Sequence, residues 1–316
     1  MERLLIFTAG TSLLDNLKDP DKLNRHELVD TFRYAGANAC HTVLRRAGNI
    51  RDDLVTYASF FAPLDLADPS ERSWATAEMA GLYLLRQGQQ TSRDRLVLLC
   101  SDTGEGAFCA LANGMLLGQE VRYYDSRGNV SPLDGLTTTE VEHGIHPSLT
   151  AIRLPQVEVV WVKDLDATRP REFERRAISD LVKHIAELHY SRRSGEQTVL
   201  NYTGGFKAAI PILAQAAAVA GNIELLCLYE EALDLIHQSL IQLKLRPKAE
   251  ERLIWAGEND EAHPDPLRDC NTLDRLPREE WPFYEELPGG GLQLSSLGLA
   301  MRELLRARER WSEVHR

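Results

Sequence analysis

The 316-residue chain is long enough for one large domain or two ordinary ones, and its content of 43% hydrophobic and 26% charged residues is normal for a soluble globular protein. Its net charge of −11 excludes the broadly basic surface that non-specific DNA or RNA binding requires, although a small anion can still bind in a local pocket. No apolar run reaches membrane-spanning length, and the five scattered cysteines contain no CxxC pair, so we expect a cytoplasmic protein with reduced thiols and with no membrane partner, metal site or cofactor.

The first half of the chain alternates apolar strands with loops of small residues and with helices. Residues 4–7 form a short strand, and the loop 8–12 leads into a helix that Thr11 or Ser12 is expected to cap. The next predicted elements are a helix at 26–46, a strand or irregular segment at 54–61, a helix at 73–85, a strand at 95–100, a helix at 107–117 and a strand at 120–124.

The second half continues the alternation as far as residue 247. The predicted elements are a polar loop at 128–147, a strand at 157–162, a helix at 170–190, a strand at 199–202, a helix at 208–220, a strand at 223–229 and an edge strand or hairpin at 235–245. Strands that alternate with helices predict an α/β fold with a mostly parallel, Rossmann-like sheet flanked by helices.

The composition changes after residue 247 and becomes acidic, irregular and proline-containing. A short helix at 274–281, a hairpin around the turn at 287–294 and a charged terminal helix through Arg310 predict a small α+β appendage that resembles a winged helix. We therefore divide the chain into a domain at 1–247 and a second domain at 248–316.

The most informative stretch is residues 198–211, where a strand, a glycine turn and a helix follow one another. Gly204 and Gly205 allow close approach of another backbone or of a ligand, and the helix N-terminus that follows attracts anions. Lys207 lies in the first helical turn, where a cation gains nothing from the helix dipole, and this indicates an external anion such as phosphate. The alternative is a glycine-rich turn with a solvated lysine.

Two further loops, at 8–12 and 101–106, take the same place after a strand. Because ligands of open α/β sheets bind outside the carboxyl ends of the strands, the three loops predict one shared pocket. None of them fits a Walker A or a GxGxxG pattern. Asp102 and Glu105 are expected to bond to backbone N–H groups rather than to catalyse, because carboxylates repel a polyphosphate.

These motifs together resemble a known family. Gly10-Thr11-Ser12, Ser101-Asp102-Thr103-x-x-Gly106 and Asn201-x-Thr203-Gly204-Gly205-Phe206-Lys207 occur in the order found in CARF (CRISPR-associated Rossmann fold) proteins of type III CRISPR systems, on the Csm/Csx-like branch, and the resemblance covers about residues 1–247. It implies a homodimer that binds a cyclic oligoadenylate, often cyclic tetra-adenylate, across its two-fold axis. The ligand-binding positions that it implies are Gly10, Thr11, Ser12, Ser101, Asp102, Thr103, Gly104, Thr203, Gly204, Gly205, Phe206 and Lys207.

Some relatives in this family are ring nucleases, which implies catalytic roles for Ser12 and Lys207. Attack of a ribose 2′-OH on the adjacent phosphorus needs no metal, and Lys207 would stabilise charge on the phosphoryl oxygens while Ser12 orients the 2′-OH or a phosphate oxygen. No histidine lies in the three loops, which predicts a slow enzyme that switches off a signal.

Two alternatives remain open. One is a non-catalytic sensor that regulates DNA binding or a partner effector through the C-terminal segment, where arginines are interleaved with glutamates. The other is a HEPN-type ribonuclease, because Arg310 and His315 have the Arg-x4-His spacing, although fewer than seventy residues follow residue 247 and a chance match explains it better.

Overall fold

The computed structural model describes residues 2–30, 32, 47–87, 93–125, 144–204, 206–229, 234–257, 265–267, 270 and 272–314. The chain forms two compact units. The first contains a seven-stranded sheet and consists of residues 1–166, 193–207 and 224–239. The second is mostly helical and consists of residues 167–192, 208–223 and 240–316. The predicted domain boundary after residue 247 stays a prediction. No helix in the described ranges is long and apolar enough to cross a membrane.

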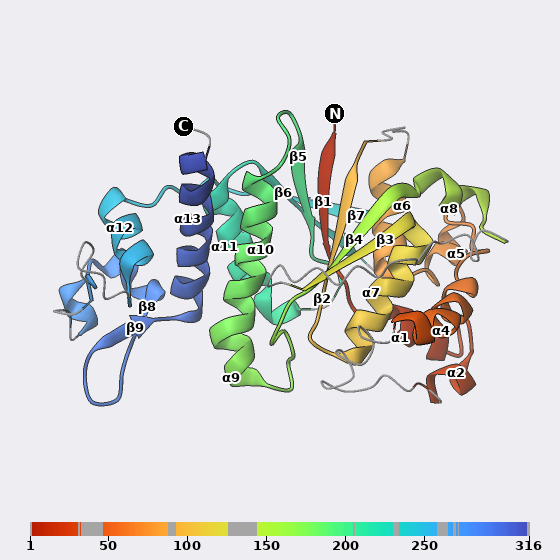
Figure 1. The fold of residues 1–316 in the computed structure, drawn as a ribbon, viewed down its shortest axis with the longest axis horizontal. Helices are drawn as coiled ribbons and strands as arrows, with labels where there is room; N and C mark the ends of the chain where they lie inside the picture. Colours follow the sequence, from red (N-terminus) through yellow and green to blue (C-terminus); the bar gives the residue numbers. More distant parts are fainter. Residues whose placement is uncertain are drawn as a thin grey trace. The chain divides into compact units, whose positions relative to one another are not determined.

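The sheet has the strand order β3-β4-β2-β1-β5-β6-β7 (Figure 1). Its strands are β1 (Arg3–Thr8), β2 (Arg95–Cys100), β3 (Gly118–Asp125), β4 (Leu154–Trp161), β5 (Gln197–Asn201), β6 (Ile223–Tyr229) and β7 (Asp234–Gln238). The central strand β1 pairs in parallel with β2 and with β5, and Leu5 lies opposite Leu96 and Val199. At one edge of the sheet, β7 runs antiparallel to its neighbour β6. The predicted Rossmann-like α/β fold with a mostly parallel sheet flanked by helices is confirmed.

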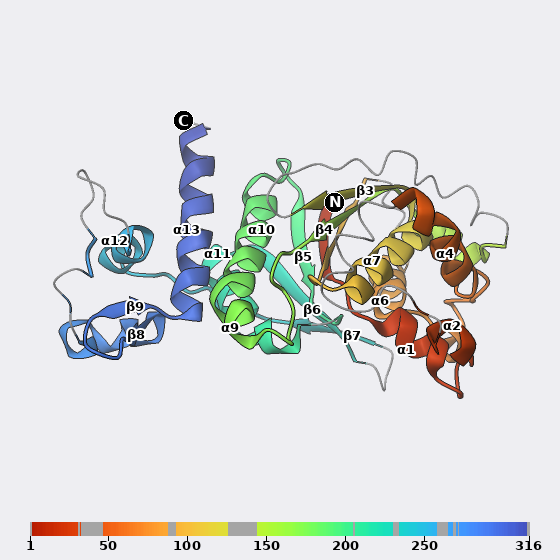
Figure 2. The ribbon, with the colours of Figure 1, turned by 60° about the horizontal axis from the view of Figure 1, so that its bottom comes forward.

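The helices of the first unit lie on one face of its sheet, and the core of that unit lies between the two layers (Figures 1 and 2). They are α1 (Ser12–Lys18), α2 (His26–Asp30), α4 (Ala47–Ser59), α5 (Pro69–Arg72), α6 (Ala77–Arg86), α7 (Gly104–Leu117) and α8 (Pro147–Ile152). Every residue of α7 except Glu105 is buried, because its alanines, glycines and leucines fit closely against the sheet.

The predicted strand or irregular segment at 54–61 is wrong, because most of it belongs to α4. Leu54 and Ala58 lie one helical turn apart and are fully buried, and the ring of Tyr57 meets that of Phe108 edge to face with centroids 5.0 Å apart. Packing against α7 therefore overrides the strand preference of the aromatic residues. The predicted helix at 26–46 is described only as α2 and Phe32, and most of the predicted loop at 128–147 lies outside the described residues.

The second unit contains the predicted helix at 170–190, the apolar helix after Lys207 and the C-terminal elements. The first is one continuous run of α9 (Pro170–Glu172), the π-helical turn η2 (Phe173–Ala177) and α10 (Ile178–Tyr190), and the second follows the 3-10 helix η3 (Lys207–Ala209) as α11 (Ile210–Ala220). The remaining elements are α12 (Pro247–Trp255), η4 (Leu273–Arg275), η5 (Arg278–Phe283), β8 (Tyr284–Glu286), β9 (Leu292–Leu294) and α13 (Ser296–Val314). The predicted hairpin, now seen as β8 and β9, and the predicted terminal helix are confirmed.

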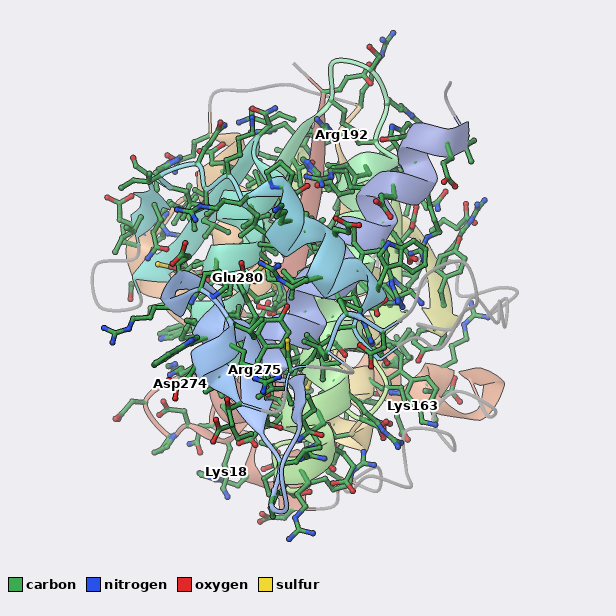
Figure 3. All side chains as sticks on the ribbon, turned by 90° about the vertical axis from the view of Figure 1, so that its left-hand side faces the viewer. Lys18, Lys163, Arg192, Asp274, Arg275 and Glu280 are labelled. Atoms are coloured by element: carbon green, nitrogen blue, oxygen red, sulfur yellow. The ribbon has the colours of Figure 1, made fainter. Side chains whose placement is uncertain are left out.

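Charged contacts hold the C-terminal elements together. α12 packs against α13 (Figures 1 and 2). Arg252 of α12 donates through Nε over 2.8 Å to Oε2 of the buried Glu280, a residue that is labelled in Figure 3. The arginines of α13 also bond within this unit: Arg302 to the Ala256 carbonyl at 3.2 Å, Arg306 to the Ile254 carbonyl at 2.7 Å, Arg308 to Glu250 at 2.8 Å and Arg310 to Glu187 at 3.0 Å.

Candidate ligand-binding site

The three predicted loops lie at the same end of the sheet, where the carboxyl ends of its central parallel strands meet. They follow β1, β2 and β5, which are neighbours in the sheet and run in parallel, so their carboxyl ends point the same way. After β1 the chain forms β2, β3 and β4, which all lie on one side of β1 in the sheet. After β4 it crosses to β5, which lies on the other side of β1. This reversal is a topological switch point, where open α/β sheets form a crevice for a ligand.

Loop 8–12 and loop 203–207 are joined directly. The Thr8 hydroxyl donates a hydrogen bond to the Gly204 carbonyl oxygen. A Cβ atom on Gly204 would lie 2.3 Å from the Thr8 carbonyl oxygen and 2.9 Å from the Gly10 nitrogen, distances that real Cβ atoms do not reach. Glycine at 204 is therefore required by the close approach of the two backbones.

Thr203 ties β5 to β6 at this edge. Its backbone N–H and its hydroxyl donate to Oδ1 of the buried Asn201 over 3.0 and 2.5 Å, and its Oγ1 accepts a hydrogen bond of 2.6 Å from the Leu228 N–H. These bonds use the side chain of Thr203 to hold the loop after β5 against β6.

The side chain of Asp102 points back into the fold. Its Oδ1 accepts from the Trp161 indole N–H and its Oδ2 from the Asp164 backbone N–H, both at 2.9 Å, and the residue is 5% exposed. The expectation that Asp102 bonds a backbone N–H is confirmed. Thr103 caps α7 by accepting from the Gly106 N–H at 3.1 Å, and its Oγ1 lies 2.8 Å from the half-buried Ser101 hydroxyl.

The predicted N-cap of the first helix is confirmed in its position at Thr11 but not in its side-chain hydrogen bond. Thr11 occupies the N-cap position without a side-chain capping bond, and its hydroxyl donates instead to Asp15 over 3.2 Å. The Ser12 hydroxyl bonds to the start of α6, where it accepts from the Ala77 N–H at 3.3 Å and donates to Oε2 of Glu78 at 3.4 Å. The Ser12 side chain therefore links the start of α1 to the start of α6.

The sequence reasoning missed Glu78, which lies directly behind the joined loops. It is 2% exposed, and its Oε1 accepts from the Gly10 N–H at 2.9 Å, while Oε2 also accepts from Nδ2 of Asn113 on α7 at 3.2 Å. Burial raises the pKa of Glu78 above its usual value, and the hydrogen bonds from Gly10, Thr76 and Ser12 oppose this shift. The sequence contained one signal of its burial. Glu78 precedes Leu82 by one helical turn, so the two side chains lie on the same, buried face of the helix.

The groups of these loops that solvent reaches are suited to an anionic ligand. Lys207 and Thr11 are exposed, while Gly10, Ser12 and Phe206 are half-buried, and Phe206 adopts a left-handed φ of 47°. Such a conformation is uncommon for a bulky residue and is found where surrounding structure enforces it. Gly205 lies outside the described residues. No group of three or more His, Cys, Asp or Glu in the described ranges is arranged to hold a metal ion.

Comparison with known proteins adds one finding. The model of a protein family described as "CRISPR-associated protein (Cas_APE2256)" matches residues 73–238, which is more than half of the 316-residue chain. The matched range includes Glu78 and the loops 101–106 and 203–207. A search of curated proteins gives no match.

Proposed function

The chain belongs to this CRISPR-associated family, which is of the CARF type, and we propose that it binds cyclic tetra-adenylate made by type III CRISPR complexes and slowly cleaves the ring. The observation that carries the proposal is the joining of loops 8–12 and 203–207 at the switch point of the sheet, with Lys207 exposed. We further propose a cytoplasmic homodimer in which two copies of this site hold one symmetric ring, so that cleavage ends an antiviral signal.

The chemistry fits the groups present. A ribose 2′-OH attacks the adjacent phosphorus, the bond to the 5′-oxygen breaks, and the product carries a 2′,3′-cyclic phosphate. This route needs the reacting groups held in line and the charge on the phosphoryl oxygens stabilised. The exposed ammonium of Lys207 would supply the second requirement.

A sensor without catalytic activity is the competing function. In its DNA-binding form the C-terminal helix would present free arginines, but four arginines of α13 donate hydrogen bonds within the second unit, so they give this form no support. His315 of the proposed ribonuclease motif lies outside the described residues.

One experiment tests the proposal. Purified protein is incubated with radiolabelled cyclic tetra-adenylate in EDTA, and the products are separated by chromatography. Linear products with a 2′,3′-cyclic phosphate end are expected. Tight binding of a ring that stays intact would support the sensor, and neither binding nor cleavage would overturn both.

Lys207→Ala provides the matching variant. Loss of an electrostatic stabiliser of this kind costs roughly 10²–10³ in rate. The control is Lys18→Ala, which removes the same charge from an exposed position at the far end of α1. Equal cleavage by the two variants would show that Lys207 does not stabilise the reacting phosphate.

A further inference from the structure

Glu78 is a buried carboxylate that the proposed reaction has not yet used. Three donors converge on it: the Gly10 N–H, the Ser12 hydroxyl and the Asn113 amide. Two of these donors come from loop 8–12, so Glu78 is joined by hydrogen bonds to a loop of the candidate site.

These contacts fix the direction of the Ser12 hydroxyl. A hydroxyl has one proton to donate and two lone pairs to accept with. The proton of Ser12 is donated to Glu78, and one lone pair accepts from the Ala77 N–H. The remaining lone pair can accept a hydrogen bond from a ligand. A ribose 2′-OH is a donor and matches it, whereas an ionised phosphate oxygen is only an acceptor and does not.

We propose that Glu78 is the proton acceptor in ring cleavage and that it acts through Ser12. The proton of the attacking 2′-OH passes to Ser12 Oγ as the proton of Ser12 passes to Glu78 Oε2. The 2′-oxygen forms its bond to phosphorus, the bond from phosphorus to the 5′-oxygen breaks, and the 5′-oxygen takes a proton from a water molecule. The hydroxide that remains takes a proton back from Glu78 through Ser12, which restores the carboxylate. The inference rests on the proposed function and assigns Ser12 to the 2′-OH rather than to phosphate.

The burial of Glu78 supports this role. Burial raises the pKa of this carboxyl, which makes the ionised carboxylate a stronger base than an exposed glutamate. The ionisable side chains of the neighbouring helices are Asp15 and Lys18 of α1 and Glu105 and Cys109 of α7, and Lys207 lies in the joined loop 203–207. Burial raises the pKa of the Cys109 thiol well above its usual value, so that group stays neutral.

The test compares Glu78→Gln with Glu105→Gln. Both glutamates are the second residue after a threonine N-cap, on α6 and α7, so the two variants make the same chemical change at matched helix positions. Single-turnover cleavage of cyclic tetra-adenylate and its binding are measured for each at pH 7.5. Glu78→Gln should bind the ring and cleave it roughly 10²-fold more slowly, as expected for loss of a general base, and Glu105→Gln should match the wild-type protein.

Two further measurements separate a proton acceptor from a merely structural residue. The wild-type rate should fall as the pH is lowered and Glu78 becomes protonated, and Glu105→Gln should keep this profile while Glu78→Gln loses it. The double variant Ser12→Ala, Glu78→Gln should be no slower than the slower single variant, because residues that act as one unit are not additive.

The outcomes distinguish the two proposals. A wild-type protein that neither binds nor cleaves the ring overturns the proposed function itself. A wild-type protein that cleaves while Glu78→Gln cleaves equally fast, or keeps the same pH profile, overturns the role of Glu78 alone. If Glu78→Gln fails to fold, the pH dependence of the wild-type protein decides. A wild-type cleavage rate that does not fall as the pH is lowered also overturns the role of Glu78.

Discussion

The indole N–H of Trp161 donates a hydrogen bond of 2.9 Å to Asp102, which fixes the loop after β2 to the end of β4. The second carboxylate oxygen of Asp102 accepts the Asp164 N–H at the same distance. Both carboxylate oxygens of Asp102 therefore accept a hydrogen bond. An amide side chain has only one oxygen and could accept only one of the two. The residue that the sequence motif offers for ligand binding is thus also a buried link between neighbouring parts of the sheet.

Asp102→Asn should destabilise the protein by about 1–3 kcal/mol, because its amide NH₂ would face a backbone or an indole N–H and leave a buried donor unsatisfied. Chemical denaturation measures the change. Asp21→Asn, at an exposed position, should remain within about 0.5 kcal/mol of wild type. Equal stabilities would mean that the contacts of Asp102 do not contribute to folding.

Gly204→Ala should be among the most damaging single substitutions, at about 3 kcal/mol or more, because its Cβ would lie 2.3 Å from the Thr8 carbonyl oxygen and 2.7 Å from Glu78 Oε1. Gly195→Ala separates this clash from backbone strain. Gly195 has a φ of 83° but nothing lies within 4 Å of its added Cβ, so only the conformational cost of about 1–2 kcal/mol applies. A smaller loss for Gly204→Ala than for Gly195→Ala would contradict the close approach of the loops.

His189 should make the protein less stable in acid. Burial, together with Arg192, lowers the pKa of this imidazole to about 4 from its usual 6.5. The stability that the neutral ring provides is complete above pH 6.5 and is lost as the pH falls toward 4. Between pH 7 and 4.5 the free energy of unfolding of His189→Gln should therefore fall by roughly 2–3 kcal/mol less than that of the wild-type protein. Denaturant titrations at the two pH values measure the difference.

The control for His189 is His26→Gln, which removes an exposed imidazole. It should keep the wild-type dependence on pH. If both variants become equally insensitive to acid, the buried position of His189 is not the cause.

Glu280→Ala should cost about 2–3 kcal/mol, because it leaves Arg252 without the buried carboxylate that accepts its Nε–H and Nη2–H. Its neighbour provides the comparison. Glu279 forms an exposed pair with Arg246 at 2.7 Å, and such pairs contribute at most about 1 kcal/mol. In thermal unfolding, the melting temperature of Glu280→Ala should lie well below that of Glu279→Ala. The reverse order would contradict the assignment of the buried pair.

The alternation of strands and helices along the chain and the three loops could be predicted from the sequence, because each depends on a local pattern. The strand 95–100 is apolar after Arg95, the strand 223–229 contains only one charged residue, Glu224, and their predicted limits agree with β2 and β6. Small residues after three of the strands then mark the candidate ligand-binding end of the sheet. The hairpin and the terminal helix were equally local, since a glycine turn and a helical periodicity define them.

The parts that could not be predicted depend on contacts between distant residues. Ser12 looked like a helix cap, yet its hydroxyl bonds to Glu78, 66 positions away. Glu78 itself looked like an ordinary charge on a helix, and only the approach of Gly10 and Asn113 makes it part of the site. The prediction for the segment 54–61 was wrong for the same reason. The packing of Tyr57 against Phe108, a distant residue, favours a helix there.

The pairing of α10 with α13 determines when the second unit can be completed during synthesis. The two helices pack against each other although about a hundred residues separate Tyr190 from Ser296. At roughly 5–20 residues per second, a ribosome needs on the order of 5–20 s to make that interval. The apolar side of α10 stays uncovered by its partner for that time, so a nascent chain stalled before residue 296 should be a preferred substrate for chaperones.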